Sequence, residues 1–256
     1  MLQNSTRRFD LYDFFSVLLP GGALMVGLFP FLPETTQLGS VGTIVPVLIG
    51  GFVIGRGVHS AAIASEDFWG ETSHREYFKD EIKKSQLNVP SDLPEETVDE
   101  FCEECEALFD GITLDWNQSP QEIDQMLDAV YQHVRSYIHV DARGRSRTFQ
   151  AVYAFYRSMW FVSLLLGAVY FMYGLLKELG AVEGTVAYTS FIGTAEIPPG
   201  LIILGSTTFV LGSYRYFREA KFDYRRYFSL YLISDFLVIR NSRRTDSDET
   251  PPPSSP

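Results

Sequence analysis

The chain has 256 residues, of which 46% are hydrophobic, and a formal net charge of −11 at pH 7. Its basic residues are 16 Arg and 5 Lys, and this acid-rich, lysine-poor composition is similar to that of halophilic archaeal proteins. The negative charge argues against binding of nucleic acid, which needs clustered Lys and Arg, and two cysteines are too few for a disulfide framework.

Four long uncharged segments follow one another along the chain. They cover residues 14–33, 35–55, 158–176 and 197–214. A helix needs about 20 mostly apolar residues to cross roughly 30 Å of hydrocarbon. We therefore predict an all-α polytopic membrane protein with four transmembrane helices. The expected divisions are a tail with spans one and two (1–57), an acidic helical insert (58–157), spans three and four (158–216), an amphipathic helix (217–240) and a disordered tail (241–256).

The distribution of Lys and Arg predicts the orientation of these spans. If the N-terminus is cytoplasmic, the outer segments are residues 35–40 and 178–196, and neither contains Lys or Arg. Of the 21 basic residues, 20 then lie on the cytoplasmic side, and Lys177 lies at the outer edge. Because positive residues concentrate in cytoplasmic segments, we expect both termini in the cytoplasm and the spans in the plasma membrane.

Two pairs of small residues have the four-residue spacing that lets membrane helices approach closely. They are Gly51 with Gly55 in the second span, and Ser163 with Gly167 in the third. These helix-packing residues face either another helix of the same bundle or a second copy in a homo-oligomer. Pro20 is expected to kink the first span or delay its start, because proline lacks a backbone donor.

No Asp, Glu, Lys, Arg or His lies in the middle of any predicted span. Pumps and coupled transporters usually carry ionisable groups there to bind ions or relay protons. The sequence therefore argues against an ion-coupled transporter, but not against a passive pore formed by an oligomer.

The insert between spans two and three is predicted to be helical and cytoplasmic. A helix over residues 61–87 is expected to continue the second span, and residues 88–94 contain two prolines that break it. At the other end, a helix from about Ser146 is expected to lead into the third span.

Two amphipathic helices are predicted between these ends. The first starts near Glu95 and ends at residues 110–111, and the second starts at Ser119 and Glu122, which form a capping box around Pro120. Apolar residues at three- and four-residue steps mark their buried faces. These are Val98, Phe101, Cys102, Cys105, Leu108 and Phe109 in the first, and Ile123, Met126, Leu127, Val130, Tyr131, Val134 and Ile138 in the second.

The insert is strongly acidic. Between Lys84 and Arg135 there is no basic residue, and residues 92–128 contain thirteen Asp and Glu. This stretch is either a docking surface for cations or a basic partner, or a solvated acidic face. Residues 217–240 mix aromatic and basic residues, which suits a helix at the inner membrane surface or one packed against the insert.

Two short motifs carry candidate chemistry. Cys102 and Cys105 have the spacing of a zinc or redox site, but both lie on an apolar stripe, where free cysteine acts as a small hydrophobe. The later histidines, His133 and His139, are six residues apart and point to different faces of one helix. Glu71-x-x-His74 is half of a di-iron motif, without its second copy. We predict no catalytic, cofactor-binding or metal site, and no enzyme.

A likeness to known proteins rests on three short motifs. They are Leu11-Tyr-Asp-Phe-Phe15, then Leu18-Leu-Pro-Gly21, and the stretch from Phe149-Gln150 to Tyr156-Arg157-Ser158. With these motifs and its two-plus-two arrangement of spans, the chain resembles a group of small prokaryotic, haloarchaeal-type multi-pass membrane proteins. No established activity comes with this resemblance, so it implies no functional residues.

The expected function is that of a membrane-anchored interaction or sensing scaffold, whose insert binds an unknown cytoplasmic protein. The alternative is a homo-oligomeric pore or membrane-perturbing effector, for example in defence, with the insert as its gate.

Overall fold

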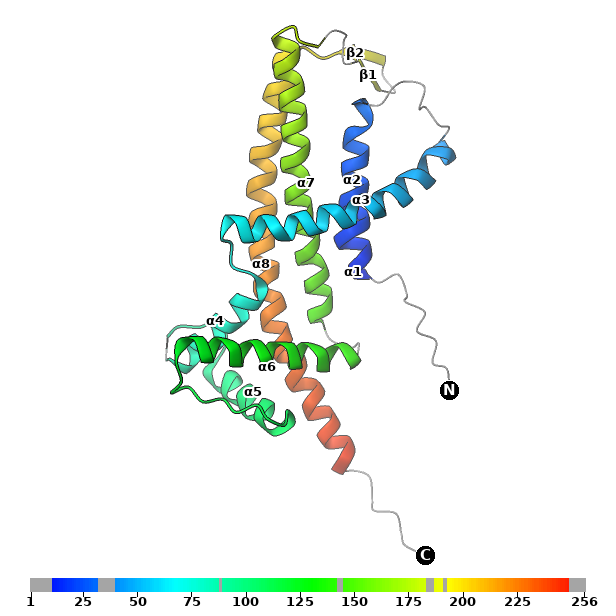
Figure 1. The fold of residues 1–256 in the computed structure, drawn as a ribbon. Coiled ribbons are helices and arrows are strands. Elements are labelled where there is room, and N and C mark those ends of the chain that lie inside the picture. Colours follow the sequence, from blue (N-terminus) through cyan, green and yellow to red (C-terminus); the bar gives the residue numbers. More distant parts are fainter. Residues whose placement is uncertain are drawn as a thin grey trace, which may run out of the picture. The chain divides into compact units, whose positions relative to one another are not determined.

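The computed structural model describes residues 11–31, 40–87, 89–141, 145–182, 187–190 and 193–248. This part of the chain is helical apart from one two-stranded hairpin (Figure 1). It forms two compact units. Unit 1 combines Met1–Glu71 with Ala151–Asp223, and unit 2 combines Thr72–Gln150 with Tyr224–Pro256. The second unit thus includes C-terminal residues that the sequence placed outside the insert.

Unit 1 opens with a helix that changes its winding. The segment consists of α1 (Leu11–Asp13), a π-helix (Phe14–Leu18), α2 (Leu19–Leu28) and a 3-10 helix (Phe29–Phe31). Pro20 lacks the N–H that would bind the Ser16 carbonyl, and the π-turn accommodates this loss. The Ser158 hydroxyl donates a hydrogen bond of 3.2 Å to the Ser16 carbonyl instead. A hydroxyl from another helix thus satisfies the backbone group that proline frees.

Three helical segments in the described residues are long and apolar enough to cross a membrane. They are Phe14–Phe31, Leu48–Glu66 and Ser146–Glu178. The second belongs to α3 (Ser40–Trp69), which continues through Gly55, the predicted end of the span. Residues 35–39 of the predicted span lie outside the described residues. The segment Leu48–Glu66 contains Arg56, His59 and Glu66, which all lie beyond Gly55, the end of the predicted uncharged span.

The helix expected over residues 61–87 is two helices. The helix α3 ends at Trp69, and Gly70 follows with a φ of +62°, a left-handed conformation that favours glycine. A capping box then starts α4 (His74–Gln86): the Glu76 N–H donates to the Ser73 hydroxyl at 3.2 Å, and the Ser73 N–H donates to the Glu76 carboxylate at 2.8 Å.

The two amphipathic helices of the insert begin where the sequence predicted. They are α5 (Glu95–Leu108) and α6 (Pro120–Asp141). After α5, Gly111 adopts a φ of +85°. Before α6, the Ser119 N–H donates to the Glu122 carboxylate at 3.0 Å, as the capping box requires. Both predicted starts are confirmed. They could be predicted because their signals lie in the few residues next to each start.

Unit 2 has its own hydrophobic core. The core lies between α4, α5, α6 and the C-terminal part of α8 (Pro199–Asp248). Its fully buried side chains are Phe78, Ile82, Val98, Phe101, Cys105, Val130, Val134, Ile233 and Phe236. Burial of each large apolar side chain stabilises the fold by about 1.5–3 kcal/mol. The apolar stripes predicted for α5 and α6 are the faces that form this core.

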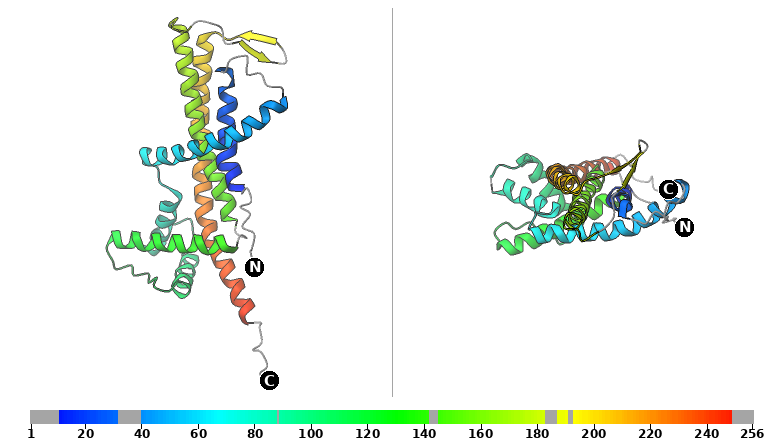
Figure 2. Two further views of the ribbon diagram at one scale, coloured as in Figure 1. Left: turned by 45° about the vertical axis from the view of Figure 1, so that its right-hand side comes forward. Right: turned by 90° about the horizontal axis from the view of Figure 1, so that it is seen from above.

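The last two helices of unit 1 lie side by side (Figure 2). They are α7 (Ser146–Glu178) and α8, and an antiparallel hairpin of β1 (Ala187–Ser190) and β2 (Gly193–Glu196) lies between them in the sequence. The hairpin occupies part of the predicted outer segment. The helix α8 extends without a break to Asp248, into residues predicted as a disordered tail, and residues 249–256 lie outside the described part.

Candidate functional site: a buried ionic cluster

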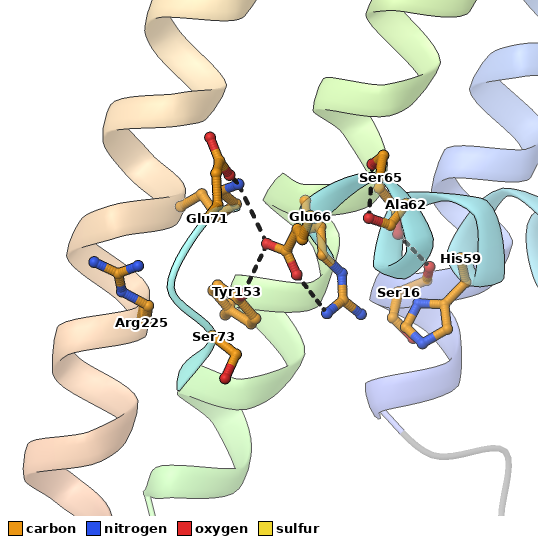
Figure 3. Close-up of polar contacts among 12 residues, drawn as sticks. Ser16, His59, Ala62, Ser65, Glu66, Glu71, Ser73, Tyr153 and Arg225 are labelled. Carbon is orange, nitrogen blue, oxygen red and sulfur yellow. Dashed lines mark hydrogen bonds and ion pairs between the residues drawn. The ribbon is translucent and has the colours of Figure 1, made fainter. Parts of the chain in front are cut away.

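Charged side chains from three helices meet inside unit 1. Glu66 of α3, Arg157 of α7 and Lys221 of α8 have exposed fractions of 5%, 6% and 2%. Arg157 Nη1 lies 3.2 Å from Glu66 Oε2, and Lys221 Nζ lies 3.2 Å from Glu66 Oε1. The Tyr153 hydroxyl donates a hydrogen bond of 2.9 Å to Glu66 Oε1 (Figure 3). We call Glu66, Glu71, Tyr153, Arg157 and Lys221 the ionic cluster.

Glu71 is the second carboxylate of this cluster. It accepts a hydrogen bond from Lys221 Nζ, so the lysine bridges Glu66 and Glu71. Arg218 Nε lies 3.5 Å from Glu71 Oε1, and the Arg218 guanidinium also lies over the Tyr214 ring at 5.4 Å. Glu71 therefore interacts with two cations of α8.

Aromatic rings cover the buried cations. Lys221 Nζ lies 5.2 Å from the centroid of the Trp160 ring, and Arg157 Cζ lies 5.4 Å from that of Tyr153. Trp160 itself is 3% exposed. A cation held over a ring is stabilised by about 0.5–2 kcal/mol, and the upper end of this range applies where water is excluded. The rings therefore stabilise the charges that burial would otherwise destabilise.

Helical spacing and one turn bring these side chains together. Tyr153, Arg157 and Trp160 recur at four and three residues on α7, which places them on one face. The turn after α3 brings the two carboxylates together, because the Glu71 N–H donates to the Glu66 carbonyl at 3.1 Å. The site thus depends on the turn at Gly70, which ends α3 directly before Glu71.

The ionic cluster joins α3, α7 and α8 through buried ion pairs and a hydrogen bond. Taking a charge out of water costs several kcal/mol, and removing one partner of a buried pair destabilises a protein by about 3–5 kcal/mol. Here the carboxylate of Glu66 is held by two cations and one hydroxyl. Any arrangement that separates the three helices leaves a buried charge without its partner.

The sequence did not predict this cluster. From the sequence, Arg157 and Lys221 are expected only among the positive residues on the cytoplasmic side. Glu71 is expected only as part of Glu71-x-x-His74, half of a di-iron motif. The one local signal is the shared face of Tyr153, Arg157 and Trp160, where a cation is flanked by two aromatic residues on a helix that enters an apolar segment.

The predicted helix-packing residues Gly51 and Gly55 lie where α3 crosses α2. A Cβ atom added at Gly55 would overlap with the Val17 carbonyl, and one added at Gly51 would lie 3.1 Å from the Gly22 nitrogen. On the facing helix, a Cβ atom at Gly21 would overlap with the Gly51 carbonyl. In this structure the two glycines therefore face a helix of the same chain.

The second predicted pair lies on α7. Ser163 is 2% exposed, and its hydroxyl donates to the Met159 carbonyl at 2.8 Å in the same helix. Gly167 faces α8, where an added Cβ atom would overlap with the Val210 side chain. Ser163 therefore forms a hydrogen bond within α7, and Gly167 contacts the neighbouring helix α8.

The residues of the two chemical motifs lie apart from one another. Cys102 and Cys105 are free thiols in the core of unit 2, where burial raises the pKa of Cys102 to about 12 and also raises that of Cys105. Glu71 belongs to the ionic cluster of unit 1, whereas the His74 ring lies 5.0 Å from the Phe228 ring in unit 2. Within the described ranges, no three His, Cys, Asp or Glu side chains are grouped to hold a metal ion.

The acidic stretch of unit 2 is partly neutralised by cations of the same unit. Its ion pairs join Asp124 with Lys79 and Lys83, Asp128 with Arg75 and Lys79, Asp92 with Arg226, and Glu104 with Arg240 and Arg244. In contrast, four exposed carboxylates on one face of α5 form no ion pair with the described residues. We call Glu96, Asp99, Glu100 and Glu103 the acidic face of α5.

A comparison of this chain with models of protein families, with curated proteins and with solved structures found no match in any of the three. The ionic cluster and the acidic face of α5 are therefore the features from which a function is inferred.

Proposed function

We propose that this chain is a membrane-anchored scaffold whose helical unit binds a basic protein partner in the cytoplasm. Three apolar helices support the membrane anchor. A fourth span is residues 197–214, which are uncharged and lie mostly in α8, beside α7. With the spans bounded as the sequence predicts, 20 of the 21 basic residues lie on one side of them, and the positive-inside rule then favours a plasma-membrane protein with both termini in the cytoplasm.

The acidic face of α5 is the observation that carries the binding function. Its four carboxylates point away from the core-forming side of the helix, on which Val98, Phe101 and Cys105 are fully buried. Other acids in the same stretch form ion pairs with Lys and Arg of unit 2. The described Lys and Arg of unit 2 form no such pair with the four carboxylates of this face. Complementary charge steers a partner toward such a surface and fixes its orientation.

The ionic cluster supports a scaffold rather than a loose anchor. It holds α3, α7 and α8 together through buried pairs, each of which has defined partners and leaves little room for an alternative packing.

Site-specific photo-crosslinking in cells tests the binding function. Ala107 is exposed on α5, near the acidic face, and replacing it with a photoreactive residue retains all four carboxylates. We expect a crosslinked protein with a basic surface. The product should disappear in the variant Glu96→Gln/Asp99→Asn/Glu100→Gln/Glu103→Gln.

The control places the photoreactive residue at Gln125, which is exposed on α6. Crosslinks that are the same at both positions, or that survive neutralisation of the acidic face, would contradict the proposal. A single-channel conductance from the purified protein in liposomes would favour the alternative function, an oligomeric pore.

A further inference from the structure

The apolar part of α8 is covered on one side only in unit 1. Ile202 and Ser206, on the side near α7, are 8% and 6% exposed. Along another side of α8, exposed residues recur at steps of four and three. We call this set the α8 seam: Leu201, Gly205, Thr208, Gly212, Arg215 and Glu219. A 4-3 repeat is the spacing by which two helices pack along a left-handed coiled-coil seam.

The two glycines of the α8 seam are not required by packing within the chain. A Cβ atom at Gly205 or Gly212 would meet no atom of the described residues within 4 Å. By contrast, a Cβ atom at Gly174 of α7 would lie 2.8 Å from the Ile203 side chain. Glycine in a helix interior is destabilising relative to alanine, and its use in membrane helices is to let another backbone approach.

The charges at the end of the seam identify the approaching helix. The side chains of Arg215 and Glu219 are 82% and 66% exposed, and they lie 3.3 Å apart on α8. In a parallel pair of α8 helices related by a two-fold axis, Arg215 of each copy is one turn from Glu219 of the other. Two copies in one membrane are parallel by necessity, because they insert with the same orientation.

We propose that two copies of this chain dimerise in parallel through the α8 seam. This interface is complementary to itself, as a two-fold interface must be: small residues meet in the apolar part, and at its end Arg215 of each copy lies one turn from Glu219 of the other. It differs from the Gly51 and Gly55 pair, which α2 of the same chain occupies. The inference rests on the proposed membrane function in one respect, namely that α8 is the fourth span.

Cysteine crosslinking at two adjacent threonines tests the seam. Thr207 and Thr208 are both exposed on α8, but Thr208 lies in the seam and Thr207 does not. In a Cys102→Ala/Cys105→Ala background, oxidation of native membranes should give at least tenfold more disulfide-linked dimer for Thr208→Cys than for Thr207→Cys. Equal yields, or no dimer for Thr208→Cys in the membrane, would overturn the proposal.

Charge reversal tests whether the end of the seam pairs between copies. We expect Arg215→Glu and Glu219→Arg each to reduce the Thr208→Cys crosslink, because all four charges at the end of the seam then have the same sign. Coexpression of the two variants with different tags should restore a mixed dimer, since each copy then supplies the charge the other lacks. Pairing within one helix cannot be restored by mixing, so an unrestored crosslink counts against the interface.

Two further readouts separate this proposal from the membrane topology. If Thr208→Cys reacts with a water-soluble, impermeant thiol reagent in open membrane vesicles, then α8 is not a span and the topology fails. If it is protected but gives no dimer, the seam faces lipid and the dimer proposal alone fails. Gly205→Leu and Gly212→Leu should lower the crosslink several-fold, whereas Gly200→Leu, off the seam and in open space, should leave it unchanged.

Discussion

The Tyr153 hydroxyl on α7 donates a hydrogen bond to the Glu66 carboxylate on α3, at a distance of 2.9 Å. Both residues are buried, with exposed fractions of 2% and 5%. This bond joins two helices that are distant in the sequence, and Arg157 and Lys221 hold the same carboxylate from α7 and α8. The stability of unit 1 should therefore respond strongly to changes at Glu66.

Replacing Glu66 with Gln should destabilise unit 1 by about 3–5 kcal/mol, because Arg157 and Lys221 lose a buried negative partner. The measurement is the free energy of unfolding in detergent, or the shift of the Tm. The control is Asp13→Asn, which breaks the more exposed pair between Asp13 and Arg56 and should cost at most about 1 kcal/mol. Similar losses for both variants would show that the cluster has no special role.

Tyr153→Phe removes the hydroxyl and keeps the ring that lies beside Arg157. The free energy of unfolding should fall by less than for Glu66→Gln. A typical hydrogen bond contributes about 0.5–1.5 kcal/mol, and one to a charged group up to about 3 kcal/mol. Combined with Glu66→Gln, the two changes should be less than additive, since they remove parts of one interaction. Strict additivity in the double-mutant cycle would place Tyr153 outside the cluster.

Two glycines of α3 give a matched test of its contact with the π-helix Phe14–Leu18. A Cβ atom at Gly55 would overlap with the Val17 carbonyl, whereas one at Gly57 would meet no described atom within 4 Å. Gly55→Ala should therefore destabilise unit 1 by about 1–3 kcal/mol or more through overpacking. Gly57→Ala should be neutral or slightly stabilising, because alanine is the better helix former. Detergent melting curves of both variants check the difference, and an unchanged Gly55→Ala would mean that α3 does not contact the π-helix at Val17.

Unit 2 could largely be predicted from the sequence, because its signals are local. The stripes of α5 and α6 and the capping box at Ser119 each lie within a few turns of one helix. The break after Trp69 is marked in the sequence by Gly70 and by the pair of Ser73 and Glu76, signals that the prediction of one helix over residues 61–87 left out of account. The ionic cluster could not be found in this way, because it pairs residues of helices that are far apart in the sequence.

The orientation of the protein can be checked by labelling single cysteines in intact cells. Thr189→Cys lies in β1, in the segment between α7 and α8, and in a background without other cysteines it should react with an impermeant thiol reagent. Gln125→Cys, exposed on α6, should react only after the membrane is permeabilised. The reason is that the positive-inside rule predicts a cytoplasmic location for unit 2. Labelling of Gln125→Cys in sealed cells would overturn the topology.

Alkaline pH should destabilise unit 2 through its two buried thiols. Burial raises the pKa of Cys102 to about 12 and also raises that of Cys105, since a thiolate is disfavoured in the apolar core. In the unfolded chain a thiol has a pKa of about 8.5. The stability that the neutral thiols provide is therefore fully present below about pH 8.5, and it is lost as the pH rises toward the folded pKa.

The expected slope is about 1.4 kcal/mol per pH unit and per thiol above that point. Denaturant unfolding between pH 8 and pH 10 measures it, with Cys102→Ala/Cys105→Ala as the reference that removes both thiols and retains every other titrating group. The native chain should lose stability faster than this variant as the pH rises, and its thiols should react with a disulfide reagent only on unfolding. Parallel curves for the two proteins, together with rapid labelling of the folded chain at pH 8, would show that Cys102 and Cys105 are ionised and reactive rather than part of the core.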